Sequence, residues 1–441
     1  MSVFFGTDGL RGVVNQELTN EVAFKCGNSI SQLFENGGKV LVGRDTRITG
    51  SYLISSLAAG LMAGGVDVVD AGIVPTAGVA FLTNKLNFDY GIVVTASHNP
   101  REYNGIKIFS SKGEKIQDKD EEKIERGFIK TKLVNSFLVG KYREDRNLIK
   151  NYINYLVDSA PSDLKGLTIV LDASNGAAYN VAPKVFKKLG AKVFKVCCNN
   201  DGENINNECG SLHPNKLQKR VVSLGANFGF AFDGDADRLI SVSEKGDVVD
   251  GDMAITALAK SFKKQGKLKG NAVVGTSQTN MGIERELEVC GIKLYRADVG
   301  DKYVSEILNK QGLSLGGEQS GHIIIKEFMQ TGDGVLSAIQ LACACKQSGK
   351  SMSNFTKVKL YPQTNINIEV KEKLRILGSE KLANAISNAS QELAGLGRVL
   401  VRASGTEPKI RIMVESENVK VSKTLAKYLA DVVCELEDSG E

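Results

Sequence analysis

Three aspartates, Asp233, Asp235 and Asp237, alternate with small residues in the sequence Phe-Asp-Gly-Asp-Ala-Asp-Arg of residues 232–238. The segments on both sides have the apolar patterns of β-strands. Alternating carboxylates on an extended loop can face one point, where they repel one another unless a cation lies among them. Ligands that are all oxygen favour a hard cation, Mg2+ or Ca2+, over zinc. Residues 233–238, the acidic loop, are therefore a candidate metal site.

The acidic loop could also be a solvated turn or part of an EF-hand. Asp-Gly-Asp also forms ordinary solvated turns. An EF-hand would use the three aspartates as its first ligands and Glu244 at its twelfth position. Its sixth position needs a glycine but holds Arg238, and the flanking patterns are strands rather than helices. An arginine beside a carboxylate-bound metal suits a phosphate that the metal also contacts.

Residues 95–100, the serine loop, follow an apolar strand pattern that begins at Tyr90. Ser97 then lies at the carboxyl end of a strand, the edge where open α/β sheets bind ligands. The Asn104-Gly105 dipeptide predicts a hairpin turn, and the return strand would bring Lys107 back toward Ser97. A plain polar turn is one alternative, and a serine hydrolase is another. The hydrolase lacks a Gly-x-Ser-x-Gly elbow, and His98 is a poor base for its own neighbour.

Three further loops combine glycines with polar side chains. Residues 317–322, the sugar loop, contain Glu318, and a carboxylate can accept hydrogen bonds from two adjacent sugar hydroxyls. Residues 402–411 carry Arg402, Arg411, two hydroxyls and a glycine, a set suited to cradling a phosphate. Residues 6–12 form another small loop that carries an arginine. Each loop alone is compatible with an ordinary turn and solvated charges.

Strand and helix patterns alternate around these loops and predict an α/β fold. The alternation begins near residue 39, resumes near 167 and occurs a third time near 272, which suggests three related units of about 100 residues each. The end of the chain differs, because two of its strands are joined by a short loop, as in an antiparallel α+β domain. The predicted domains are residues 1–150, 151–252, 253–365 and 366–441.

Composition narrows the class of protein further. The 441 residues include 56 basic and 51 acidic ones, and a net charge of +5 without basic blocks argues against nucleic-acid binding. The start has no signal-peptide pattern, and the uncharged stretch of residues 51–66 is shorter than the ~20 apolar residues of a membrane span. The eight cysteines include no CxxC pair, and we expect them to be reduced thiols. We therefore expect a cytoplasmic protein with no membrane partner.

Together the loops resemble those of the α-D-phosphohexomutase superfamily, and most closely its bacterial phosphoglucosamine mutase branch. Residues 5–12 are similar to the opening motif of that branch. The other four motifs are the phosphoserine loop at 95–100, the metal loop at 233–238, the sugar loop at 317–322 and the phosphate loop at 402–408. The five matches occur in order along the whole chain, without a departure at a motif position.

The resemblance implies four domains around a central cleft: three related α/β domains with mixed sheets and a smaller C-terminal α+β domain. Ser97 would carry a phosphate, and one Mg2+ per chain would be held by Asp233, Asp235, Asp237 and a phosphoserine oxygen. The expected substrate is a phosphosugar. Glucosamine 6-phosphate would become glucosamine 1-phosphate through glucosamine 1,6-bisphosphate or a similar hexose bisphosphate, and the product would feed UDP-N-acetylglucosamine and cell-wall precursor synthesis.

The resemblance also implies roles for the remaining polar residues. Arg11 would stabilise charge in the transition state, and Lys107 and His98 are the candidates for general acid and base, with the family pattern favouring Lys107. The predicted substrate contacts are Arg238, Glu318, Ser320, Arg402, Ser404, Gly405, Thr406 and Arg411. The candidate assembly is a homodimer. A phosphomannomutase or phosphoglucomutase of the same superfamily, and a non-catalytic sugar-phosphate or metal sensor, are the alternatives.

Overall fold

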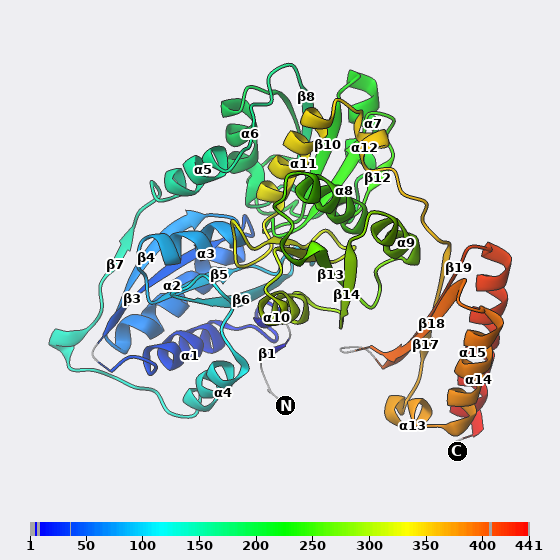
Figure 1. Ribbon diagram of the computed structural model, residues 1–441. Coiled ribbons are helices and arrows are strands. Elements are labelled where there is room, and N and C mark those ends of the chain that lie inside the picture. Colours follow the sequence, from blue (N-terminus) through cyan, green and yellow to red (C-terminus); the bar gives the residue numbers. More distant parts are fainter. Residues whose placement is uncertain (1–4, 7–8, 36, 405–407, 440–441) are drawn as a thin grey trace. The chain divides into compact units, whose positions relative to one another are not determined.

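The computed structural model describes residues 5–6, 9–35, 37–404 and 408–439 (Figure 1). The chain forms two compact units. The first consists of Met1–Gln278 and Cys290–Lys357, and the second of Thr279–Val289 and Val358–Glu441. Among the described residues, no helix is both long and apolar enough to cross a membrane.

The first unit begins with a seven-stranded mixed sheet in the order β1-β2-β6-β5-β3-β4-β7. Its strands are β1 (Phe5–Gly6), β2 (Gly9–Val13), β3 (Gly38–Arg44), β4 (Val66–Ile73), β5 (Tyr90–Val94), β6 (Tyr103–Ser110) and β7 (Tyr142–Glu144). Its helices are α1 (Asn20–Ser31), α2 (Thr49–Ala63), α3 (Thr76–Lys85), α4 (Asp118–Gly127) and α5 (Ile149–Asp158). Alternate strand residues face opposite sides, so Val40 and Val42 pack with α1 and α2 while Leu41 packs with α3.

Two smaller mixed sheets complete the first unit. One has the order β12-β11-β10-β8-β9 and the other β14-β13-β15-β16. Their strands are β8 (Thr168–Asp172), β9 (Lys192–Val196), β10 (Phe228–Phe232), β11 (Leu239–Ser243), β12 (Val248–Val249), β13 (Ala272–Thr276), β14 (Lys293–Ala297), β15 (Leu315–Gly317) and β16 (Ile323–Ile325). The helices are α6 (Ala178–Lys188), α7 (Asn215–Leu224), α8 (Gly251–Lys264), α10 (Asp301–Gln311), α11 (Gly334–Ser348) and α12 (Met352–Phe355). The predicted α/β layering with mixed sheets is confirmed.

The second unit is a three-stranded antiparallel sheet in the order β17-β19-β18, packed against helices (Figure 1). Its elements are α9 (Met281–Val289), β17 (Gln363–Glu369), α13 (Lys373–Leu377), α14 (Glu380–Glu392), β18 (Gly397–Ala403), β19 (Lys409–Ser416) and α15 (Val419–Ser439). Ile410, Ile412 and Val414 alternate along β19 and face Leu425 and Leu429 of α15 in one apolar core. The α+β architecture predicted for the end of the chain is confirmed.

Two local predictions are wrong. Residues 9–12 of the predicted loop 6–12 lie in β2, so Arg11 is on a strand. Asn104 and Gly105 lie inside β6 rather than in a turn. The hairpin itself exists: β5 and β6 are antiparallel with Val93 opposite Lys107, and residues 95–102 connect them. A Cβ on Gly105 would lie 2.6 Å from the carbonyl oxygens of both Leu10 and Thr95. The glycine therefore allows neighbouring strands to approach closely, a packing requirement that its turn propensity does not reveal.

Candidate active site

The acidic loop connects two paired strands, since Phe232 at the end of β10 lies opposite Leu239 at the start of β11. Within the loop, Ala236 has a φ of +60°. All three aspartates are buried, and one carboxylate oxygen from each lies within 4.8 Å of the others. The convergence predicted from their alternation is present in the structure.

The acidic loop packs against the serine loop. A Cβ on Gly234 would lie 2.5 Å from the carbonyl oxygen of Ser97, so a glycine is required for this approach. Ser97 has a φ of +51° and is 1% exposed. Its Oγ donates a hydrogen bond of 2.6 Å to Oδ2 of Asp233. The strained serine therefore points directly into the carboxylate cluster.

Lys107 balances part of the negative charge in this cluster. Its Nζ lies 2.9 Å from Oδ2 of Asp235 and 3.1 Å from Oδ2 of Asp237, and its side chain is 2% exposed. Burial and the charges of Asp237 and Asp235 raise the pKa of Asp233 well above its usual range. Burial also acts to raise the pKa of Asp237, but Lys107 and His322 outweigh it and hold that pKa low. One ammonium group thus sits among three buried carboxyl groups.

The residues of the acidic loop fit a hard divalent cation. Oδ1 of Asp235 and Oδ1 of Asp237 are buried, and neither accepts a hydrogen bond from the described residues. A buried carboxylate oxygen without a donor is costly unless a cation satisfies it. With Asp233 beside them, these oxygens form the ligand set that Mg2+ prefers.

His98 and Arg11 also lie at the serine loop. Nδ1 of His98 is 3.2 Å from Oγ of Ser97. Burial, followed by the charges of Arg238 and Arg11, lowers the pKa of His98 to about 4, so its imidazole is neutral near pH 7. Nη1 of Arg11 donates to Oδ1 of Asn99, which ties β2 to the serine loop.

The sugar loop lies beside the acidic loop. Arg238 and His322 form a backbone bridge, and the amide of Leu239 donates to the carbonyl of Gly321. Glu318 accepts a hydrogen bond from the amide of Gly300 through Oε1, while the side chain of Ser320 is exposed. The structure therefore brings the serine, acidic and sugar loops together within the first unit.

The predicted phosphate loop belongs to the second unit. Arg402 on β18 and Arg411 on β19 are opposite one another, and Nη2 of Arg411 lies 3.4 Å from Oγ of Ser404. Burial and the charge of Arg411 lower the pKa of Arg402. Two neighbouring guanidinium groups favour an anion. Gly405 and Thr406, the other two predicted contacts, lie outside the described residues.

Two residues that hold the serine loop, Arg47 and Asn206, are not among the predicted site residues. Arg47 is 0% exposed, and its guanidinium donates to the carbonyl oxygens of Ser97, Asn99, Pro100 and Tyr103 and to Oδ2 of Asp45. Nδ2 of Asn206 donates to the carbonyls of Ser97 at 2.8 Å and Asn99 at 3.0 Å. One signal was available, because Arg47 follows the carboxyl end of β3, the edge where functional residues gather.

Comparison with protein families matches four consecutive parts of the chain to phosphoglucomutase/phosphomannomutase domains. The alpha/beta/alpha domains I, II and III match residues 2–134, 149–246 and 250–361, and the C-terminal domain matches residues 366–432. The chain belongs to the phosphoglucomutase/phosphomannomutase family. The resemblance drawn from the five loops is thereby confirmed.

Relatives within this family match over nearly the full chain. A phosphoglucosamine mutase of Thermoanaerobacter sp. (strain X514) is 45% identical over 443 residues, covering 98% of this chain and 99% of the relative. A solved phosphoglucomutase/phosphomannomutase family protein from Burkholderia thailandensis has a TM-score of 0.85 at 25% identity, covering 98% of this chain and 97% of the other. The fold is shared with Aspergillus fumigatus N-acetylphosphoglucosamine mutase, solved in complex with GlcNAc-6P and magnesium, at a TM-score of 0.70 and 17% identity, covering 99% and 96% of the two chains.

Proposed function

We propose that this chain is a phosphoglucosamine mutase that interconverts glucosamine 6-phosphate and glucosamine 1-phosphate. The observation that carries the proposal is the buried cluster in which Oγ of Ser97 donates to Asp233 while Lys107 contacts Asp235 and Asp237. This arrangement joins a nucleophile, the ammonium group of Lys107 and carboxylates suited to a metal ion, the parts that phosphoryl transfer requires. The identity to phosphoglucosamine mutases supports the choice of an amino sugar.

In the proposed reaction, phosphorylated Ser97 transfers its phosphoryl group to the free hydroxyl of the substrate. The P–Oγ bond breaks, a new P–O bond forms on the sugar, and the product of this half is glucosamine 1,6-bisphosphate. After the bisphosphate turns over, Oγ of Ser97 takes the other phosphoryl group and glucosamine 1-phosphate leaves. Because the enzyme ends phosphorylated, the cycle is balanced without an external phosphate donor.

Protons must move in both halves of this reaction. The sugar hydroxyl loses a proton when it is phosphorylated, and Oγ of Ser97 loses one when it takes a phosphoryl group back. Asp233 and the neutral Nδ1 of His98, at 2.6 and 3.2 Å from Oγ, are placed to accept the serine proton. Lys107, whose Nζ is held by two carboxylates, is the candidate acid or base for the sugar hydroxyl.

Mg2+ bound by the three aspartates would supply positive charge to the phosphoryl oxygens. Arg11 and Arg238 would add to that charge from the protein. We assign the 3- and 4-hydroxyls of the sugar to Glu318 and Ser320, since these hydroxyls look alike in both orientations of the bisphosphate. The phosphate that is not reacting is assigned to Arg402, Ser404, Gly405, Thr406 and Arg411. A homodimer and a cytoplasmic location stay predictions.

A coupled assay of glucosamine 1-phosphate formation tests the proposal. Wild-type protein, with Mg2+ and a hexose bisphosphate primer, should turn over, and Ser97→Ala should abolish turnover. The matched control is Ser110→Ala at the end of β6, which should retain activity. Full activity in Ser97→Ala would refute the mechanism.

The choice of sugar is tested separately. Intact-protein mass should show one phosphate on wild type and none on Ser97→Ala. Glucosamine 6-phosphate should give the highest kcat/KM among the glucosamine, glucose and mannose 6-phosphates. A preference for glucose or mannose would leave the mechanism in place and replace the assigned substrate.

A further inference from the structure

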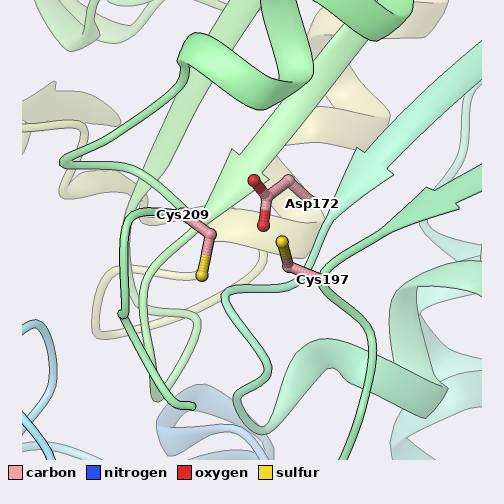
Figure 2. Close-up of side chains that lie close together, drawn as sticks. All are labelled: Asp172, Cys197 and Cys209. Atoms are coloured by element: carbon pink, nitrogen blue, oxygen red, sulfur yellow. The ribbon is translucent and has the colours of Figure 1, made fainter.

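A second cluster of metal-ligating side chains lies outside the catalytic cluster. Asp172, Cys197 and Cys209 each place one ligand atom within 4.8 Å of the other two, as Figure 2 shows. Both cysteines are free thiols. The proposed phosphoryl transfer uses none of the three, so their convergence needs another explanation.

The fold brings these side chains together from three places. Asp172 ends β8 and Cys197 follows β9, and these parallel strands are in register with Asp172 opposite Val196. The loop after Cys197 returns to the same edge of the sheet at Cys209. Two backbone amides fix the carboxylate: Ser174 donates to Oδ1 at 2.8 Å and Gly210 to Oδ2 at 3.0 Å. Each carboxylate oxygen retains lone-pair capacity for a cation.

The charge of the cluster favours a cation. Asp172 is 0% exposed, and burial raises its pKa to about 6, although the amides of Ser174 and Gly210 and the charge of Lys216 oppose the rise. Its carboxylate is therefore ionised near pH 7 in a buried position. The hydrogen bond between the two thiols lowers the pKa of Cys197 and, with burial, raises that of Cys209, so Cys197 is the thiol that ionises more readily. Buried negative charge is stabilised when it is paired or coordinates a metal.

We propose that Asp172, Cys197 and Cys209 bind a thiophilic divalent cation of the Zn2+ class. Two thiolates and a carboxylate are zinc ligands, whereas the all-oxygen acidic loop suits Mg2+. With zinc–sulfur bonds of about 2.3 Å, tetrahedral ligands lie about 3.8 Å apart, so small side-chain rotations bring donors within 4.8 Å into place. A water molecule would take the fourth position.

This site lies at the base of a segment that reaches the serine loop. Residues 198–208 run between the two cysteines and include Asn206, whose Nδ2 donates to the carbonyls of Ser97 and Asn99. Oγ of Ser174 also donates to Oδ1 of Asn206. A cation that joins Cys197 to Cys209 closes the base of this segment. The site thus adds a restraint on a residue that, like Arg47, supports the serine loop through the carbonyls of Ser97 and Asn99.

Cadmium titration of the full-length protein, kept reduced with a phosphine, tests the site. Cd2+ should produce a sulfur-to-cadmium charge-transfer band that saturates at one equivalent and is displaced by Zn2+. The acidic loop contains no sulfur and cannot produce this band. Cys197→Ser and Cys209→Ser should each weaken Cd2+ binding by at least about tenfold.

The matched control is Cys198→Ser, because Sγ of Cys198 donates to the carbonyls of Val196 at 3.3 Å and Leu171 at 3.8 Å instead of joining the cluster. This variant should bind Cd2+ like wild type. Circular dichroism checks that each variant folds. If Cys209→Ser does not fold, Cys197→Ser still tests the site, because Cys197 is only half-buried. No band at one equivalent in wild type, unchanged affinity in Cys197→Ser, or loss of the band in Cys198→Ser would overturn the proposal.

Discussion

Replacement of Arg47 by lysine tests whether this residue holds the serine loop through its hydrogen bonds or only through its positive charge. Arg47 is fully buried, and its five side-chain hydrogen bonds go to Asp45 and to four carbonyl oxygens of residues 97, 99, 100 and 103. Lysine keeps the positive charge but offers three donors from one nitrogen. At least two of the five acceptors must therefore lose the hydrogen bond from residue 47.

The structure indicates which acceptor is left without a hydrogen bond and how much free energy of unfolding is lost. Asn206 still donates to the carbonyls of Ser97 and Asn99, and the amide of Tyr103 still donates to that of Pro100, so the loss falls mainly on the carbonyl of Tyr103 if lysine keeps Asp45. A buried acceptor left without a donor costs about 1–3 kcal/mol, which predicts a loss of about 1–3 kcal/mol in the free energy of unfolding. A shift of Ser97 by about 1 Å would lower kcat on the order of a hundredfold.

Urea unfolding and the glucosamine 1-phosphate assay measure these two effects. Arg101→Lys is the matched control, because Arg101 lies in the same connection between β5 and β6, with its side chain 59% exposed and paired to Glu102. The control should change the free energy of unfolding by no more than about 0.5 kcal/mol. For Arg47→Lys, kcat should fall more than KM rises. A variant that is destabilised but keeps wild-type kcat would refute the positioning role, and one that changes neither would refute the energetic argument.

Three further outcomes follow from the structure. Gly105→Ala should lower the free energy of unfolding by about 1–3 kcal/mol in a urea titration, since its Cβ would lie 2.6 Å from two carbonyl oxygens. Gly378→Ala is the control and should lower it less, because the nearest atom to its Cβ would be 3.3 Å away. Burial raises the pKa of Asp333 from 3.8 to about 6. Between pH 3.8 and about 6 the folded protein therefore keeps a proton on Asp333 that the unfolded chain has lost. The free energy of unfolding should fall by roughly 3 kcal/mol as the pH rises through this range. Asp333→Asn should flatten this slope, and an unchanged difference in stability between pH 4 and 6 would contradict the assignment. Chelation of Mg2+ should abolish turnover, and in thermal unfolding Mg2+ should raise the midpoint of wild type but not of Asp233→Asn.

The proposed catalytic cluster of Ser97 and the three aspartates was predictable because its signals are local. Alternating aspartates in one short loop, and a serine after an apolar strand, identify their positions without knowledge of distant contacts. The pairing of β5 with β6 was predicted as well, although from the wrong turn. Asn104 is buried and its Nδ2 donates to Oγ1 of Thr49, so tertiary contacts override its turn propensity.

The support of the serine loop was not predictable in the same way. Arg47 and Asn206 bind carbonyl oxygens, which every residue possesses, and they lie 50 and 109 positions from Ser97 in the sequence. No spacing rule identifies such contacts. Helix α11 was not predictable from its sequence for a different reason. Almost all of its residues are buried, so it lacks the polar face that produces a helical period in the sequence.

Phosphorylation of Ser97 and metal binding should be linked through Asp233. In the unmodified protein, Oγ of Ser97 is a hydrogen-bond donor to Asp233 at 2.6 Å. Phosphorylation removes that donor and adds a group of about two negative charges beside three buried carboxyl groups. Lys107, Arg238 and His322, whose pKa is raised to about 9, together carry less positive charge than the phosphate and three ionised carboxylates carry negative charge. A divalent cation should therefore bind the phosphorylated protein more tightly than the unmodified one. By reciprocity, cation binding stabilises the phosphoserine, so catalytic priming and metal occupancy are linked.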